Sequence, residues 1–278
     1  VASNGSLIAV GATHDLNSDV GSVFLYDQAG AAVSRIDNPA PIANDHFGWS
    51  LAMTSTHILV GAPHDDGDPA TGISDEGSAY LYNTAGNLLQ TFRNPVPRIG
   101  SGYGWAVAFL ENAPGSGSLA AGTYALVSGN DVDQAGARSG AVYMYDLATG
   151  NLVTTMASQA GDALGYDVAG IPGTNLVVSA GINEDSIETN SGAGYLFHAE
   201  SGNILLKFKK AAPGHFDFFG HTIAPLVDGS GQVLFGVEED DTGSQDTGAV
   251  YKFAIPEPAT LLLLGVGGLT LLHRRRAA

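Results

Sequence analysis

Short apolar segments alternate with polar turns along most of the chain. One such segment begins with glycine and then alternates small or aliphatic residues with aromatic ones. Its copies are residues 21–27 (GSVFLYD), 77–83 (GSAYLYN), 140–146 (GAVYMYD), 192–198 (GAGYLFH) and 248–254 (GAVYKFA). Segments rich in Val, Leu, Tyr and Phe between Gly, Asn and Asp turns are typical of β-hairpins. The pattern predicts an all-β body.

These copies belong to a longer repeat. Their first glycines are 56, 63, 52 and 56 residues apart. Upstream of four copies stands an aromatic residue or Leu followed by Gly, at residues 47–50, 103–106, 164–167 and 219–222. A third phrase lies between the two, at residues 7–15, 58–66, 125–133, 176–184 and 233–241. Three phrases that keep one order and one period indicate five repeats of a single unit.

Each unit contains four short apolar segments, so five units predict roughly twenty strands, more than one open sheet usually holds. Radial repetition of four-stranded blades, a β-propeller, accommodates that number. The period is too long for the rungs of a β-solenoid. A pair of β-sandwiches is the alternative.

The C-terminal segment has a different pattern. Pro256-Glu257-Pro258 precedes residues 259–272 (ATLLLLGVGGLTLL), fourteen residues without a charge, and His273 and Arg274-Arg275-Arg276 follow. As a helix this stretch would span about 21 Å, and a start near Ile255 brings it close to the ~30 Å hydrocarbon core of a membrane. The arginines would hold its end on the cytoplasmic side. The pattern predicts a transmembrane helix; a buried helix of the body is the alternative.

The order of Pro-Glu-Pro, apolar stretch and arginine cluster resembles the PEP-CTERM sorting signal of exported bacterial proteins. The resemblance implies that residues 255–278 are an anchor and sorting segment, with Pro256, Glu257, Pro258, Arg274, Arg275 and Arg276 as its signal residues. It further implies an exosortase-type processing enzyme as partner. The chain would be held transiently in the inner membrane, cut near Pro-Glu-Pro, and released to the cell surface or extracellular matrix.

The order aromatic-Gly, Gly-Ala-Pro and Gly-x-Val-Tyr resembles the FG-GAP repeat of integrin α-like propellers and related bacterial proteins. The second unit fits best, with Phe47-Gly48 and Gly61-Ala62-Pro63 intact. The resemblance covers residues 1–254 and implies four-stranded blades, with units ending near 27–46, 83–102, 146–163, 198–218 and 253. Residues 1–4 align with 51–54, so we expect a cut first unit and an incomplete ring, a fragment of a larger one.

Composition narrows the function. The 278 residues include 38 glycines and no cysteine, and 11 basic residues stand against 28 acidic ones, a formal charge of −17. Such an acidic chain repels phosphate backbones, so a nucleic-acid partner is not expected. The absence of cysteine excludes disulfides and thiol catalysis.

The loop after each Gly-Ala-Pro position is acidic. These loops contain His14-Asp15 and Asp19, His64-Asp65-Asp66-Gly67-Asp68, Asp131 and Asp133, Glu184-Asp185 and Glu188, and Glu238-Glu239-Asp240-Asp241. Repetition would gather them on one face, and oxygen ligands suit calcium. However, the calcium cage of the FG-GAP family, placed before the Gly-Ala-Pro strand, is missing here. The competing interpretation is that Asp and Asn cap turns and keep the surface soluble. Calcium is the one cofactor considered, and no metal ligand is assigned.

No catalytic residue is predicted, because the motifs of common hydrolases and phosphate-binding loops are absent. His14 and His64 share a repeat position and are interpreted as turn residues, with a metal ligand or base as the alternative. Tyr26, Tyr82, Tyr145, Phe197 and Phe253 share another position and predict a stacked core layer, with a sugar-binding platform as the alternative. Trp49 and Trp105, at matching positions after the aromatic-Gly, are interpreted in the same way. We therefore expect a non-enzymatic surface or matrix protein that binds protein or glycan through propeller loops. The alternatives are a polysaccharide-acting matrix enzyme and a purely structural biofilm component.

Overall fold

The computed structural model describes residues 1–15, 18–67, 72–184, 190–226, 231–240 and 248–256, and its regular elements there are all β-strands. The all-β prediction is confirmed. The hydrophobic helix predicted for residues 259–272 lies outside the described residues. Within the described ranges, no helix has the length and apolar character needed to cross a membrane.

The strands form five antiparallel sheets, and in each sheet the strands are hydrogen-bonded in chain order. The first sheet holds β1 (Ala2–Ser3), β2 (Leu7–Ala12), β3 (Ser22–Asp27) and β4 (Ala32–Asp37). The second holds β5 (Ser50–Met53), β6 (His57–Ala62), β7 (Ser78–Asn83) and β8 (Leu88–Arg93). The third holds β9 (Tyr103–Ala113), β10 (Gly122–Gly129), β11 (Ala141–Asp146) and β12 (Leu152–Ala157).

The fourth sheet holds β13 (Leu164–Ile171), β14 (Leu176–Gly181), β15 (Ala193–His198) and β16 (Ile204–Phe208). The fifth holds β17 (Thr222–Pro225), β18 (Gln232–Val237) and β19 (Ala249–Ala254), three strands within the described chain. Four strands per repeat are thus confirmed for the first four units. In the fifth unit, the last strand within the described residues is β19, which ends at Ala254.

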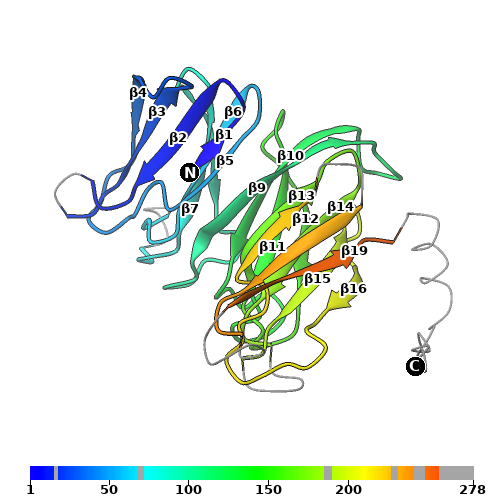
Figure 1. Ribbon diagram of the computed structural model, residues 1–278. Helices are drawn as coiled ribbons and strands as arrows, with labels where there is room; N and C mark the ends of the chain where they lie inside the picture. The colour runs from blue at the N-terminus through cyan, green and yellow to red at the C-terminus, as the bar shows by residue number, and fades with distance from the viewer. Residues whose placement is uncertain (16–17, 68–71, 185–189, 227–230, 241–247, 257–278) are drawn as a thin grey trace, which may run out of the picture.

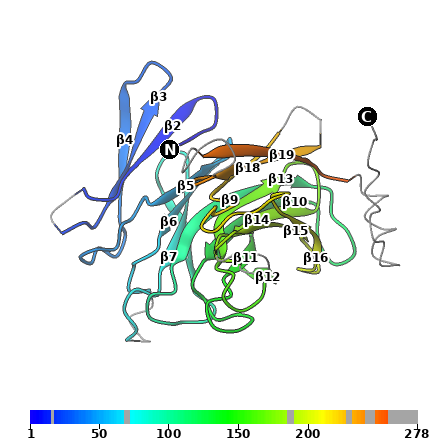
Figure 2. The same cartoon turned by 60° about the horizontal axis from the view of Figure 1, so that its bottom comes forward.

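Successive sheets are joined through their first strands. β1 lies beside β5, β5 beside β9, β9 beside β13, and β13 beside β17. Figures 1 and 2 show the sheets following one another from the blue N-terminal sheet to the orange C-terminal one. The arrangement is open: within the described chain, the first sheet shares an apolar core with the second and the last with the fourth, and the first and last sheets share none.

Each interface between neighbouring sheets has its own apolar core. The first is built from side chains such as Val23 and Leu25 of one sheet and Phe47, Val60 and Tyr82 of the next. Three further clusters fill the second, third and fourth interfaces in the same way. The three middle sheets are thus covered on both faces and the two terminal sheets on one, so the five sheets stabilise one another as consecutive repeats.

Single parallel bridges fix the relative position of the sheets. Each bridge pairs the glycine just before a third strand with a residue at or shortly before the first strand of the next sheet: Gly21 with Phe47, Gly77 with Tyr103, Gly140 with Leu164, and Gly192 with Phe219. A side chain at Gly77 would overlap the Tyr103 carbonyl oxygen, so only glycine allows this approach. The repeated glycines therefore have a structural role at the junctions.

The turns between third and fourth strands also follow from the sequence. The Asp27 Oδ1 atom accepts hydrogen bonds from the Ala29 and Ala31 amides at 2.9 and 2.8 Å. The Asn83 Oδ1 atom does the same for Ala85 and Asn87 at 3.1 and 2.9 Å. The side chain replaces backbone partners in the tight turn, which is why Asp and Asn recur there.

Candidate functional site

An open groove of about 540 Å³ runs across the first strands of the sheets. It is lined by Val1, Trp49, Ser50, Leu51, Trp105, Ala106, Val107, Tyr166, Asp167, His221 and Thr222. Four of these, Trp49, Trp105, Tyr166 and His221, occupy one repeat position, directly after the glycine of the aromatic-Gly phrase. Because the first strands adjoin, repetition brings the four rings into a row, which we call the aromatic row.

The rings of the aromatic row are in contact along its length. The ring centroids are 4.9 Å apart between Trp49 and Trp105, 5.6 Å between Trp105 and Tyr166, and 4.8 Å between Tyr166 and His221. The Tyr166 hydroxyl lies 3.1 Å from the His221 Nε2 atom, which is also 3.0 Å from a Glu238 carboxylate oxygen. The row combines extended aromatic surface with a polar end.

The prediction of a core position for Trp49 is wrong, because 41% of this residue is exposed, and Trp105 is only partly buried. The physical reason is that β5 and β9 are the first strands of their sheets and have no further strand on that side. The prediction for the other aromatic position is confirmed at Tyr82, Tyr145 and Phe197, which are at most 5% exposed. Tyr26 and Phe253, in the terminal sheets, are partly buried.

Asp167 is the one carboxylate among the residues lining the groove. Its Oδ1 atom accepts a hydrogen bond from the Val168 amide at 2.8 Å, and its Oδ2 atom accepts one from the Ile223 amide at 2.6 Å. Burial raises its pKa to about 6. Since Ile223 belongs to the fifth sheet, Asp167 connects the fourth and fifth sheets beside the groove.

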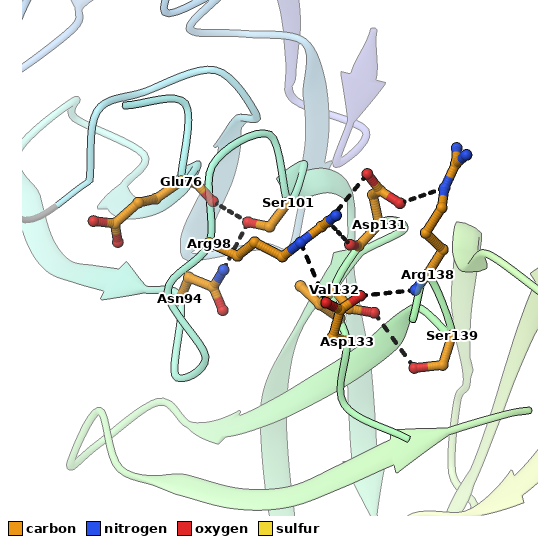
Figure 3. A network of polar contacts seen from close by, with 9 residues as sticks. All are labelled: Glu76, Asn94, Arg98, Ser101, Asp131, Val132, Asp133, Arg138 and Ser139. Carbon is orange, nitrogen blue, oxygen red and sulfur yellow. Dashed lines mark hydrogen bonds and ion pairs between the residues drawn. The ribbon is translucent and has the colours of Figure 1, made fainter. Parts of the chain in front are cut away.

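The acidic loops are held by the protein's own cations and hydrogen-bond donors. In the third sheet, the Arg98 guanidinium donates to the Asp131 carbonyl at 2.7 Å and lies 3.3 Å from Asp133 Oδ2, while Arg138 Nε lies 2.7 Å from Asp131 Oδ1 (Figure 3). Glu184 is buried between Lys207 and Lys209 at 2.8 and 2.6 Å. A calcium ion at either place would have to displace these side chains.

The remaining loops follow the same rule. Asp65 is buried and accepts hydrogen bonds from the Tyr80 hydroxyl at 2.5 Å, the Ser78 hydroxyl and the Gly67 amide. Lys210 lies 3.1 Å from Asp240, and Arg35 lies 3.4 Å from Asp15. These contacts favour the turn-capping interpretation of the acidic residues over the calcium interpretation.

A buried polar pair in the linkers between sheets was not predicted. Asn38 donates to Asp45 at 2.7 Å, Asn94 donates to Ser101 at 2.7 Å, and Lys210 lies 3.0 Å from Asp217. The sequence carries a signal for it, since the two members are seven residues apart in all three linkers. The Ser101 hydroxyl in turn donates to the Glu76 carbonyl at 2.6 Å (Figure 3), which ties the linker to the preceding sheet.

His14 and His64, which share a repeat position, are brought close to a third histidine. The ring centroids of His14 and His46 are 5.3 Å apart, and those of His46 and His64 are 5.0 Å apart. The His46 ring also stacks on Trp49, with centroids 6.1 Å apart. Burial and the two neighbouring histidines lower the pKa of His46. No pattern in the sequence groups His46 with the other two.

Of the predicted sorting-signal residues, Pro256 is the last that the structure describes. Glu257, Pro258, Arg274, Arg275 and Arg276 lie outside the described residues. Their assignment therefore depends on sequence comparison.

Comparison with known families identifies two segments of the chain. The FG-GAP repeat profile matches residues 41–82, and the PEP-CTERM protein-sorting motif matches residues 254–277. The chain thus contains an FG-GAP repeat and carries a PEP-CTERM motif at its C-terminus, as the sequence predicted. No curated protein sequence matches it.

Among solved structures, the chain is similar to a crystal structure of the computationally designed Ika8 protein, with 14% sequence identity and a TM-score of 0.47. The similarity covers 82% of this chain and 52% of the designed one, so the chain spans about half the length of that protein.

Proposed function

We propose that this chain is an exported surface protein that binds an extended glycan along its aromatic row and does not act as an enzyme. The five sheets would be consecutive blades of an open, FG-GAP-like β-propeller. Their four-stranded order, the adjoining first strands and the junction glycines support this arrangement.

Export is supported by the PEP-CTERM motif at residues 254–277. This motif implies processing by an exosortase. Anchoring by the apolar segment of residues 259–272, followed by release to the cell surface or extracellular matrix, is the route we propose. A charge of −17 is compatible with a soluble body outside the cell.

The observation that carries the binding proposal is the aromatic row. Sugar rings present C–H groups on one face, and these pack against the negative faces of aromatic rings. Four rings spaced 4.8 to 5.6 Å apart offer a surface for a chain of sugars rather than a pocket for one. Trp49 and Trp105 supply the largest area, while His221 and Glu238 at the other end supply polar groups for hydroxyls.

The one alternative with a specific observation behind it is a polysaccharide-acting enzyme. Asp167 has a raised pKa, and Glu238 lies near the same end of the groove, so two carboxyl groups are available for acid–base chemistry. Against this, both Asp167 oxygens already accept backbone hydrogen bonds that join two sheets. We therefore favour binding without turnover.

The test is a titration of the full-length chain, in a detergent without sugar headgroups, against soluble bacterial polysaccharides and their oligosaccharides. Tryptophan fluorescence and calorimetry would report binding. We expect Trp105→Ala to weaken binding at least tenfold, because its ring contacts both neighbours in the row. Trp49→Ala should act in the same direction.

Phe216→Asn is the matched control, since Phe216 is an aromatic residue with 47% exposure that does not line the groove, and asparagine tolerates its positive φ of 60°. Its affinity should equal that of the unchanged chain. Equal affinity for Trp105→Ala would contradict the proposed site. Release of shorter sugars, lost in Asp167→Asn, would favour the enzyme, and no binding to any glycan would favour a structural component.

A further inference from the structure

A cluster of two histidines and an aspartate lies at the junction of the first and second sheets, outside the groove. His14 follows β2, Asp19 precedes β3, and His46 stands in the linker before β5. One potential ligand atom of each, an imidazole nitrogen or a carboxylate oxygen, lies within 4.8 Å of the others. Residues 32 positions apart in the chain are thus brought together by the packing of two sheets.

The backbone holds this cluster in place. The His46 amide donates to the Asp19 carbonyl at 3.1 Å, and the Phe47 amide donates to the Val20 carbonyl at 3.0 Å. Asp19 and His46 both have left-handed backbone conformations, with φ of 57° and 54°. The relative position of their side chains is therefore set by a hydrogen-bonded junction rather than by two independent loops.

The other junctions show that side chains at these repeat positions meet. In the third sheet, the residues equivalent to His14 and Asp19 are Asp131 and Arg138, which form the 2.7 Å ion pair of Figure 3. In the second sheet they are His64 and Asp75, whose Nδ1 and Oδ1 atoms are 3.9 Å apart. The residue equivalent to His46 there is Gly102, so that junction lacks the third ligand.

The first junction also contains a buried imidazole nitrogen that could bind a metal ion. The Nδ1 atom of His46 is buried and has no hydrogen-bond partner among the described residues. His64 packs edge-on against the same ring, with centroids 5.0 Å apart. A buried imidazole nitrogen without a partner loses free energy unless an ion, a water molecule or a proton donor satisfies it.

We propose that His14, Asp19 and His46 bind a divalent transition metal ion, with zinc as the best fit. Two imidazoles and one carboxylate are the ligand types that zinc accepts, at bond lengths of about 2.0–2.2 Å. Ligand atoms around a tetrahedral zinc ion at those bond lengths are ~3.4 Å apart. The ligand atoms of the three side chains would therefore move about 1 Å closer together on binding. The fourth position is open to water or to His64. Calcium prefers oxygen ligands and does not suit this set.

The experiment is calorimetry of the full-length chain with zinc chloride after treatment with a chelator. We expect one equivalent of zinc to bind at micromolar concentration or tighter, and calcium to give no heat at this site. His46→Gly should weaken zinc binding at least tenfold, and glycine already occupies the equivalent position at Gly102 without loss of the fold. Asp19→Asn preserves the shape and tolerates the positive φ, and it should also weaken binding.

His57→Gln is the matched control, because His57 is the first residue of β6 and its ring contacts the Thr56 hydroxyl instead of the cluster. Its zinc affinity should be unchanged.

His14→Gln alters an exposed side chain, so it tests the site even if the other variants fold poorly. Copper or nickel should quench tryptophan fluorescence in the same variants that bind zinc, since His46 stacks on Trp49. Zinc affinity that is equal in all variants would overturn the proposal. So would the absence of binding at a zinc concentration of about 100 μM, roughly ten to a hundred times the expected Kd.

Discussion

At the scale of single residues, the repeated glycines and the residues next to them have different roles. Gly104 has a φ of 90°, and a side chain there would overlap the Ser78 carbonyl oxygen of the preceding sheet. Its neighbour Trp105 points its ring into the groove. The glycine allows two sheets to approach, and the approach places the next side chain in the aromatic row. One dipeptide thus links packing to the proposed binding surface.

Replacing Gly104 with alanine should destabilise the fold through steric overlap. We expect a loss of about 3–5 kcal/mol, from a disfavoured backbone conformation and from overpacking at the junction. Urea unfolding followed by circular dichroism would measure the loss. Gly30→Ala is the matched control: Gly30 has a φ of 81° but open space around it, so we expect only about 1 kcal/mol. Equal losses would show that Gly104 is not a contact point.

At the scale of elements, the linkers between sheets contain buried polar contacts. Lys210 is buried with Asp217 and Asp240, at 3.0 and 3.1 Å. Asn38 and Asp45 occupy the corresponding places in the first linker. A buried charge is stable only when it is paired, so these contacts keep the two linkers in defined conformations, and the Lys210–Asp240 ion pair also ties the last linker to the fifth sheet. The sheets are therefore positioned by polar contacts at their edges as well as by the apolar cores between them.

The C-terminal segment is the element whose role the sequence motif defines. Changing Pro256, Glu257 and Pro258 to alanine should prevent processing and leave the whole chain in the membrane fraction of the bacterium that carries the gene. Mass spectrometry of the released protein would locate the C-terminus of the unchanged chain near Pro256. Pro95→Ala with Pro97→Ala, a second Pro-x-Pro segment in a linker, should leave processing intact. Equal release of both variants would argue against the motif as the processing signal.

At the scale of the whole molecule, the scarce positive charges are concentrated at the acidic loops. Seven of the eight basic residues within residues 1–256 contact such a loop or its linker: Arg35, Arg93, Arg98, Arg138, Lys207, Lys209 and Lys210. The loops are thus partly neutralised, and the rest of the surface keeps the excess negative charge. That distribution favours solubility and disfavours binding to nucleic acids.

The stability of the molecule should fall as the pH rises. Burial raises the pKa of Asp45 to about 7 and that of Asp167 to about 6, so the folded state binds protons that the unfolded state has released. Their stabilising effect is fully present below the ordinary aspartate pKa of 3.8 and is lost progressively as the pH rises from there to 7. We expect the free energy of unfolding to be lower at pH 8 than at pH 5 by an amount on the order of 2 kcal/mol.

Urea unfolding at the two pH values would check this expectation, and Asp45→Asn should reduce the difference. Asp146→Asn is the matched control, since it removes one negative charge at an exposed turn where the second sheet already has Asn83. Its pH dependence should be that of the unchanged chain. A stability that rises from pH 5 to pH 8 would contradict the assignment.

Much of the fold follows from the sequence because its cause is local. The apolar segments, the Asx turns and the period of the glycines predict strands, hairpins and five repeated units, and the PEP-CTERM and FG-GAP phrases can be recognised from short stretches of residues. Burial was predictable for Tyr82, Tyr145 and Phe197, which lie on inner strands of a sheet. These properties depend on neighbours within one repeat.

The candidate sites depend on contacts between repeats, and those only the tertiary structure decided. Trp49 and Trp105 are large apolar residues of the kind usually found in a core. They line a surface groove instead, because the first strand of each sheet has no further strand beside it. His46 meets His14 and Asp19 across a sheet junction, and no spacing within a single unit encodes that meeting. Side-chain exposure and ligand geometry are set by how the sheets pack on one another, and that packing is a non-local property of the chain.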